Sequence, residues 1–318
     1  LAAEGAGMDP VELGSLCDRA GDAANSSFTW ESALRLFEAA LAIVPYFASL
    51  DPTARGWLQC RTARVNGITG SRPRARELYA AAIENLRGSS DFHAWGLAVL
   101  GWARTFTSAG EPIPDDALER EFSEAAGNDA LDLRVRLLTQ RADALQLARD
   151  PRDEEAARAA VALSTRSTDR EARAGAVATL GLVQMRHLDP AAALASFEAA
   201  ERETLTLDSP IGRGWGPARK AWPMIVLGDL RGAARAARQA GDTARTAHDW
   251  VHGALSAAFL HSIEVLNGDA EAANLAGREA VRLIDRSTYL QASFILDAAV
   301  AWDRLLRAEF EEAIDAAA

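Results

Sequence analysis

A single helical stripe recurs along this chain at intervals close to forty residues. In "DPAAALASFEAA" (189–200), a small residue, an aromatic residue four positions later and a second small residue three positions after that share one face of a helix. The equivalents of the first small residue are Ala33, Ala75, Leu118, Ala156, Ala193, Ala233, Ala273 and Ala313. The pattern predicts one helical unit repeated about eight times.

Acidic residues mark the turns inside these units. They stand about four positions before the last five stripes, at Asp150, Asp189, Asp229, Asp269 and Glu309. Glycine precedes several of them, as in "LGDL" (227–230). A glycine that ends one helix, followed by an acidic N-cap that begins the next, joins two helices by a tight turn. We therefore expect an all-α chain of antiparallel hairpins, with a second apolar helix before each turn, as in "ATLGLVQMRH" (178–187).

The pattern resembles the tetratricopeptide repeat, which has a Leu-Gly pair in its first helix, an Ala-Phe-Ala stripe in its second and a closing proline. One unit matches it at Leu180, Gly181, Ala193, Phe197 and Ala200, and another at Gly21, Ala33, Phe37, Ala40 and Pro45. The period near 40 instead of 34 is a departure, as are Ala160, Ala237 and Gly277 at the aromatic position. HEAT-like repeats are the alternative. The resemblance implies a right-handed α-solenoid of about eight hairpins, with a concave groove lined by the first helices.

Composition favours one such domain over residues 1–318. No Pro-, Gly- or Ser-rich linker divides the chain, and its ends, Leu1 and "EEAIDAAA", suggest a piece of a longer polypeptide. The net charge of −11 without a basic tract argues against nucleic-acid binding by this segment. No apolar run is long enough for a transmembrane helix, so we expect a soluble, cytoplasmic protein that contacts no membrane. Cys17 and Cys60 are expected to be buried free thiols.

Tryptophans provide the candidate ligand site. Two pairs each have the spacing i, i+7, and the pairs are separated by three periods of the repeat, with a further tryptophan two periods later. The candidates are Trp57, Trp95, Trp102, Trp215, Trp222 and Trp302. By analogy with tetratricopeptide geometry these positions face the groove, where indoles could grip an apolar small molecule or a peptide. Packing between neighbouring first helices is the alternative. Arg104 and Arg219 could bind an anionic group, although a solvated arginine face, with Arg64 and Arg186, is the simpler interpretation.

Other motifs point to no catalytic residue, metal or cofactor. "IGRGWGPARK" (211–220) lacks the strand and GK[ST] ending of a phosphate loop, and we expect a loop that leads into a helix, with Pro217 in the first turn. His248 and His252 have metal-compatible spacing but no HExxH motif, so ordinary helix surface is expected. The acidic clusters at 114–121 and 150–158 are expected to be turn caps.

The opening passage (16–45) looks like the start of the repeat region in large ATP-binding transcriptional regulators of the LuxR class from high-GC bacteria. That resemblance implies an ATPase module before the repeats, a helix-turn-helix module after them, and a repeat region that receives a small-molecule or peptide effector or a protein partner. The predicted function is thus a non-enzymatic sensor and interaction domain. A stand-alone scaffold that joins proteins is the alternative. An α-helical enzyme of the terpene-cyclase or prenyltransferase kind is a third hypothesis, which would need a dry acidic pocket.

Overall fold

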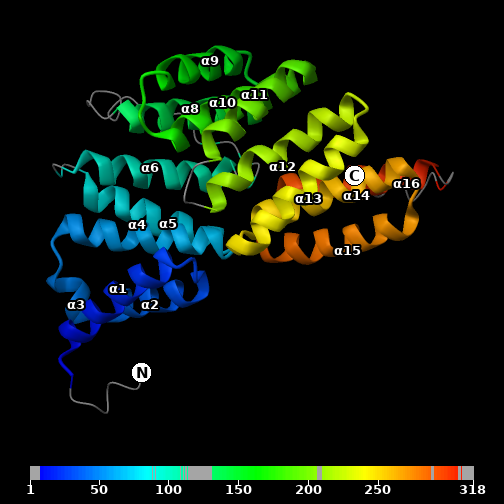
Figure 1. Ribbon diagram of the computed structural model, residues 1–318. Helices are drawn as coiled ribbons and strands as arrows, with labels where there is room; N and C mark the ends of the chain where they lie inside the picture. Colours follow the sequence, from blue (N-terminus) through cyan, green and yellow to red (C-terminus); the bar gives the residue numbers. More distant parts are fainter. Residues whose placement is uncertain are drawn as a thin grey trace. The chain divides into compact units, whose positions relative to one another are not determined.

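The structure is a computed structural model that describes residues 8–87, 89, 91–107, 109, 111, 113, 131–205, 210–287, 290–306 and 309, with only the backbone described for 210–215, 290 and 291. These residues form helices and turns, with no β-strand among them. Figure 1 shows the helices in chain order. None of the described helices is both long and apolar enough to cross a bilayer.

The helices alternate between two roles, as the repeat pattern predicts. The first helices of the hairpins are α1 (Pro10–Ser26), α4 (Pro52–Ile68), α6 (Phe92–Thr107), α8 (Leu131–Leu147), α10 (Arg170–Arg186), α12 (Pro210–Val226), α14 (Trp250–Asn267) and α16 (Leu290–Leu306). The described second helices are α2 (Trp30–Ala42), α5 (Arg72–Leu86), α9 (Asp153–Ser164), α11 (Pro190–Thr204), α13 (Leu230–Ala247) and α15 (Ala270–Ser287). A short extra helix, α3 (Val44–Ser49), follows the first hairpin and packs on α1.

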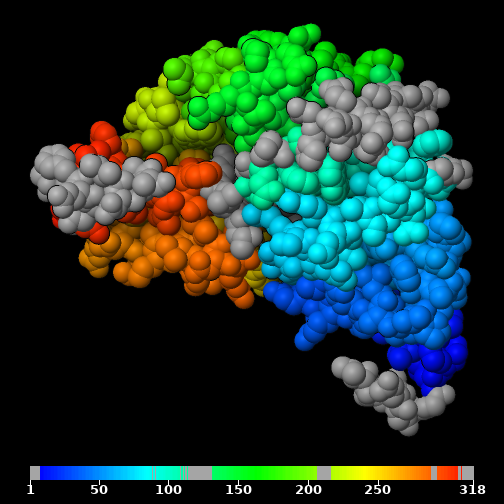
Figure 2. Space-filling model, turned by 180° about the vertical axis from the view of Figure 1, so that it is seen from behind, coloured from blue at the N-terminus to red at the C-terminus, as the bar shows by residue number. Residues whose placement is uncertain are grey.

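The chain divides into two compact units, each a stack of hairpins. Unit 1 comprises residues 1–106 and 113–133, and unit 2 comprises 107–112 and 134–318. Within unit 2, α11 contacts α12, α13 contacts α14, and the first helices α12 and α16 both contact α14. The surface colours in Figure 2 run from blue to cyan in unit 1 and from green to orange-red in unit 2, as expected when hairpins stack in chain order.

The small-large-small stripes are the core of the hairpins. Ala193, Phe197 and Ala200 are buried against α10 in one cluster with Ala178 and Leu182. The corresponding stripes of α2, α5 and α13 are also buried, whereas Leu118 and Ala313 lie outside the described residues. In the fourth unit the expected middle residue, Ala160, is buried, but the first position of the stripe lies one residue later than expected.

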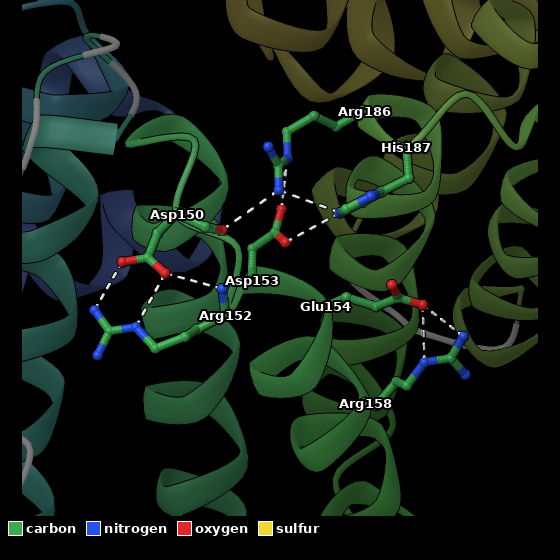
Figure 3. A network of polar contacts seen from close by, with 7 residues as sticks. All are labelled: Asp150, Arg152, Asp153, Glu154, Arg158, Arg186 and His187. Carbon is green, nitrogen blue, oxygen red and sulfur yellow. Dashed lines mark hydrogen bonds and ion pairs between the residues drawn. The ribbon is translucent and has the colours of Figure 1, made fainter.

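In that unit the buried face of α9 consists of Ala157, Ala160 and Ser164, while Ala156 is only half-buried. The reason is the helix start. We expected Asp150 to cap this helix, but α9 begins at Asp153, and the cap residue Arg152 makes no side-chain capping bond. Asp150 instead pairs with Arg152, at 2.7 Å (Figure 3). Three of the other four acidic turns behave as predicted.

Asp189, Asp229 and Asp269 each accept a hydrogen bond from the backbone N–H three residues later, at 2.8–3.0 Å. Gly228 and Gly268 precede two of these caps with φ of 83° and 76°, the left-handed conformation that glycine adopts without steric cost. Glu309 forms an ion pair with Arg304, and the residues after it lie outside the described part.

Candidate functional site

Three first helices of unit 2 line an open apolar pocket of about 520 Å³. The residues that line it come from α12, α14 and α16: Trp222, Ile225, Val226, Phe259, Ser262, Val265, Leu266, Phe294, Ile295, Ala298, Ala299 and Trp302. This volume is typical of a pocket for a small molecule or for a few side chains of a peptide.

The lining repeats with the period of the sequence. Trp222, Ser262 and Trp302 are each one repeat period apart, so three consecutive hairpins contribute the same position. Ile225 and Val265 form another such pair. Each hairpin places its equivalent residue on the same side of the stack, and the pocket is therefore a product of the repeat.

The pocket has few polar side chains. Ser262 is its one polar lining residue, and its hydroxyl already donates to the carbonyl oxygen of Ala258 at 3.0 Å. Trp222 is half-buried and packs against Ala and Phe side chains of two core clusters, whereas Trp302 is 48% exposed. The Trp222 ring is therefore held in place by the core, whereas the Trp302 ring is accessible to a ligand.

The structure places the other tryptophan candidates elsewhere. In unit 1, Trp95 is 5% exposed, and Trp102 is half-buried with its ring edge-to-face against Phe106 at 4.9 Å. Trp57 is half-buried and its indole N–H donates to Asp91 at 2.9 Å. The side chain of Trp215 lies outside the described part of the chain. Of the six candidates, the pocket thus contains Trp222 and Trp302.

The arginine candidates do not line the pocket. Arg219 is half-buried in α12, one turn before Trp222, and Arg104 is exposed on α6 of unit 1. Arg186 was expected on a solvated arginine face, and this expectation is wrong. It binds the fully buried Asp153 at 2.6 Å, because α10 packs beside the start of α9 (Figure 3).

Comparisons with known proteins agree with this architecture. No protein-family model and no curated protein sequence matches the chain. Among solved structures, a Rap protein complexed with Competence and Sporulation Factor aligns at 12% identity over 96% of both chains, with a TM-score of 0.65. The fold is that of a tetratricopeptide-repeat solenoid.

Two further solved structures have a similar fold. A Signal Transduction ATPase with Numerous Domains (STAND) protein with a tetratricopeptide repeat sensor, from Pyrococcus horikoshii, aligns at 11% identity and a TM-score of 0.53. The alignment covers 95% of this solenoid and 46% of that protein. The Cut9-Hcn1 hetero-tetramer of APC/C aligns at 10% identity over 95% and 65% of the two chains, with a TM-score of 0.52. These identities establish the fold alone.

The structure places the remaining motifs within helices or at their ends. Helix α12 already begins at Pro210, so Pro217 lies inside the helix and not in its first turn. His248 ends α13 in a left-handed conformation, φ 51°, whereas His252 is buried in α14 and not on the surface as expected. The ring nitrogen Nδ1 of His252 is 2.5 Å from Asp249. Among the residues that the structure describes, no three His, Cys, Asp or Glu side chains form a metal site.

Burial differs among three ionisable groups, and it sets the direction of the pKa shift in only one of them. Burial is the main cause that raises the pKa of the Cys60 thiol to about 12, which suppresses the reactive thiolate. Cys17 is also a free thiol, but it is only half-buried, contrary to expectation. Burial tends to raise the pKa of Asp249, yet the charge and hydrogen bond of His252 outweigh it, and the pKa is lowered.

The acidic cluster at 114–121 lies outside the described residues.

Two aromatic residues of the pocket were not among the candidates predicted from the sequence. Phe259 and Phe294 line the pocket although no tryptophan pattern points to them. The available signal was the period itself, because Phe259 lies one repeat period before Ala299, which also lines the pocket. Phe294, Ala298 and Trp302 follow one another at intervals of four on α16 and therefore share a helical face.

Proposed function

We propose that this solenoid is a non-catalytic sensing and interaction domain that receives an effector in the pocket of unit 2. The observation that carries the proposal is that Trp222 and Trp302, two repeat periods apart, line one apolar pocket together with the equivalent Ser262. A pocket of this volume, with aromatic side chains and a serine hydroxyl that is already hydrogen-bonded, suits an apolar molecule or the apolar side chains of a peptide.

The wider setting follows from the resemblances. The passage at 16–45 resembles the repeat region of LuxR-class regulators, and the STAND protein of similar fold carries a tetratricopeptide repeat sensor. We therefore propose that residues 1–318 act as one repeat domain of a longer cytoplasmic transcriptional regulator, with an ATPase module before it and a helix-turn-helix module after it. In this proposal ATP and DNA bind those modules and the effector binds here.

The test uses N-phenyl-1-naphthylamine, an uncharged fluorescent probe for apolar pockets. We expect wild-type protein to bind it with a blue shift and increased emission. Trp302→Ala removes an accessible indole from the wall and should weaken binding about tenfold, because losing a buried aromatic contact costs about 1–2 kcal/mol. The matched control is Phe92→Ala, which removes an aromatic ring of similar exposure, 50%, from unit 1.

Equal binding by wild type, Trp302→Ala and Phe92→Ala would refute the pocket as an effector site. The stand-alone scaffold would then be the better hypothesis, and partners would be sought by pull-down with the intact chain.

A further inference from the structure

The helix position that lines the pocket in unit 2 carries arginine in unit 1. Trp222, Ser262 and Trp302 occupy the same position in their helices, counted from the first residue of α12, α14 and α16. At that position α4 has Arg64 and α6 has Arg104, one repeat period apart, and both side chains are exposed. Equivalent positions of stacked repeats face the same side, so the two guanidinium groups lie on one face of unit 1.

A buried tyrosine of α5 reaches this face from the core. Tyr79 is only 7% exposed, and its phenol ring lies against Gly101 of α6, where an added Cβ atom would be 2.6 Å from the hydroxyl oxygen. Gly101 is one helical turn before Arg104. On α4, Cys60 is one turn before Arg64, and both act electrostatically on the Tyr79 hydroxyl. The absence of a side chain at Gly101 therefore allows the hydroxyl to lie close to both arginines.

The Tyr79 hydroxyl is a hydrogen-bond donor that the fold leaves unused. Among the residues that the structure describes, it has no hydrogen-bond partner. Burial is the main cause that raises the pKa of Tyr79, and the charges of Arg104 and Arg64, which lower it, do not reverse this shift. The hydroxyl therefore keeps its proton at neutral pH. Because a nearly buried hydroxyl without a partner is unfavourable, it is suited to donate to an acceptor that binds from solvent.

The neighbouring carboxylates do not neutralise Arg64. Asp22 occupies the same position in α1, but it pairs with Arg61, as does Asp18. Arg64 itself has no ion-pair partner in the described part of the chain.

The three helices that carry this group are fixed to one another. The indole N–H of Trp57 on α4 donates to Asp91, the residue before α6, at 2.9 Å. Arg76 on α5 donates to the hydroxyl of Thr105 on α6 at 3.2 Å. The donors are thus held in place before a ligand arrives, which lowers the entropy that binding costs.

We propose that Arg64, Arg104 and Tyr79 form an oxyanion site on unit 1, which binds a phosphate or carboxylate group of a ligand. The guanidinium groups supply charge and N–H donors, and the phenol adds a neutral donor between them. The site shares no residue with the pocket of unit 2 and goes beyond the function proposed for that pocket.

The experiment measures the binding of minimal anions to the intact chain. The probes are methyl phosphate, acetate and, as the uncharged comparison, methanol, and saturation-transfer difference NMR detects each through its methyl protons. Titrations are made at about 20 and about 200 mM salt. We expect at least one anion to bind with a Kd of about 1 mM at low salt and more weakly at high salt, and methanol to give no saturable signal.

Single substitutions test the residues of the site. Arg64→Gln should weaken anion binding about fivefold, because it removes a charge-assisted donor, and Tyr79→Phe about threefold, because it removes a neutral donor and keeps the ring. The matched control is Arg19→Gln, which removes another exposed arginine of unit 1 and should leave the Kd unchanged. The urea midpoint of Tyr79→Phe should not fall, since no hydrogen bond to a described residue is lost. Lost binding without lost stability would assign the hydroxyl to the ligand.

The outcomes decide both the site and its ligand. Binding of methyl phosphate alone identifies a phosphate group and binding of acetate alone a carboxylate, and either supports the site if Arg64→Gln and Tyr79→Phe weaken it. The inference is overturned if no anion binds, if Arg19→Gln loses as much affinity as Arg64→Gln, or if Tyr79→Phe binds like wild type. Because N-phenyl-1-naphthylamine tests the pocket of unit 2 and the anions test unit 1, either proposal can fail while the other stands.

Discussion

In three of the described hairpins a glycine marks a close approach of the two helices. In two hairpins a glycine of the first helix faces an aromatic ring of the second, and a Cβ atom on Gly181 would lie 2.7 Å from the Phe197 ring. In the hairpin of α14 and α15 the sizes are exchanged, since His261 faces Gly277. The His261 Nδ1 lies 2.8 Å from the Ala273 carbonyl oxygen. The missing aromatic residue is thus compensated by a larger partner, which preserves the packed volume.

Gly181→Ala should destabilise the protein. Its added methyl group would overlap the Phe197 ring, and overpacking of this kind costs about 1–3 kcal/mol of unfolding free energy. Gly241→Ala is the control, because its methyl group would meet only Ser256 at an ordinary 3.7 Å and helix propensity favours alanine by up to about 1 kcal/mol. Urea unfolding followed by circular dichroism measures both. Equal midpoints for the two variants would contradict the packing argument.

Because His261 faces Gly277, we expect the effects of substitutions at these two positions on the free energy of unfolding to be strongly coupled. Gly277→Phe should clash with the imidazole of His261, and His261→Gly should leave a void. The double variant restores the glycine-aromatic pairing of the other hairpins, so its destabilisation should be smaller than the sum of the two single effects by more than about 1 kcal/mol. Additive effects in the double-mutant cycle would show that the two positions do not compensate each other.

At the scale of the element, a buried ion pair joins α9 to α10. Asp153 is fully buried at the start of α9, where Arg186 binds it at 2.6 Å and His187 lies 3.2 Å away (Figure 3). Burial alone raises the pKa of Asp153, but the hydrogen bonds from Arg186 and His187 outweigh it, and the pKa lies below its usual range. The carboxylate is therefore charged in the folded protein at neutral pH.

Asp153→Ala should destabilise the protein by about 1.5–3 kcal/mol at pH 7, since it removes a charged hydrogen bond whose arginine is 24% exposed and can regain water. A carboxyl group with a lowered folded pKa stabilises above its unfolded pKa of about 4, and this stability is lost as pH falls through the folded value. The difference between wild type and variant should hence shrink below pH of about 4. Glu154→Ala, which breaks the exposed pair with Arg158, should change little. A pH-independent difference in urea midpoints would argue against the ionised pair.

At the scale of the whole molecule, stability is shared between neighbours. In a repeat protein each hairpin is stabilised by its own packing and by the hairpins next to it, so local damage spreads only a short way. The two compact units of this chain are consequently expected to respond separately to destabilising substitutions within them.

Gly21→Ala tests this expectation in unit 1. A Cβ atom there would lie 2.6 Å from the Phe37 ring, so α1 and α2 should separate more readily. Amide hydrogen exchange should accelerate in α1, α2 and α4 and remain unchanged from α10 to α15. Gly181→Ala should give the converse pattern. Uniform acceleration throughout the chain would mean that the units unfold as one.

The sequence predicted the helices, the hairpins and most of their buried faces, because periodicity and turn chemistry are local properties. Phe197 and Asp229 show this, since one is buried by its spacing and the other caps by its turn. The prediction failed at Asp150 and His252. Several acidic residues compete for the start of α9, and the burial of His252 depends on the helices packed around it.

The sequence by itself determined that this chain repeats, that its repeats are helical, and that equivalent positions recur every forty residues or so. Only the tertiary structure decided that Trp222 and Trp302 share a pocket while Trp95 is buried in the core of unit 1. Periodicity fixes the direction of a side chain around its own helix. Whether that direction leads to a neighbouring helix or to open surface depends on how the hairpins pack, which no short stretch of sequence contains.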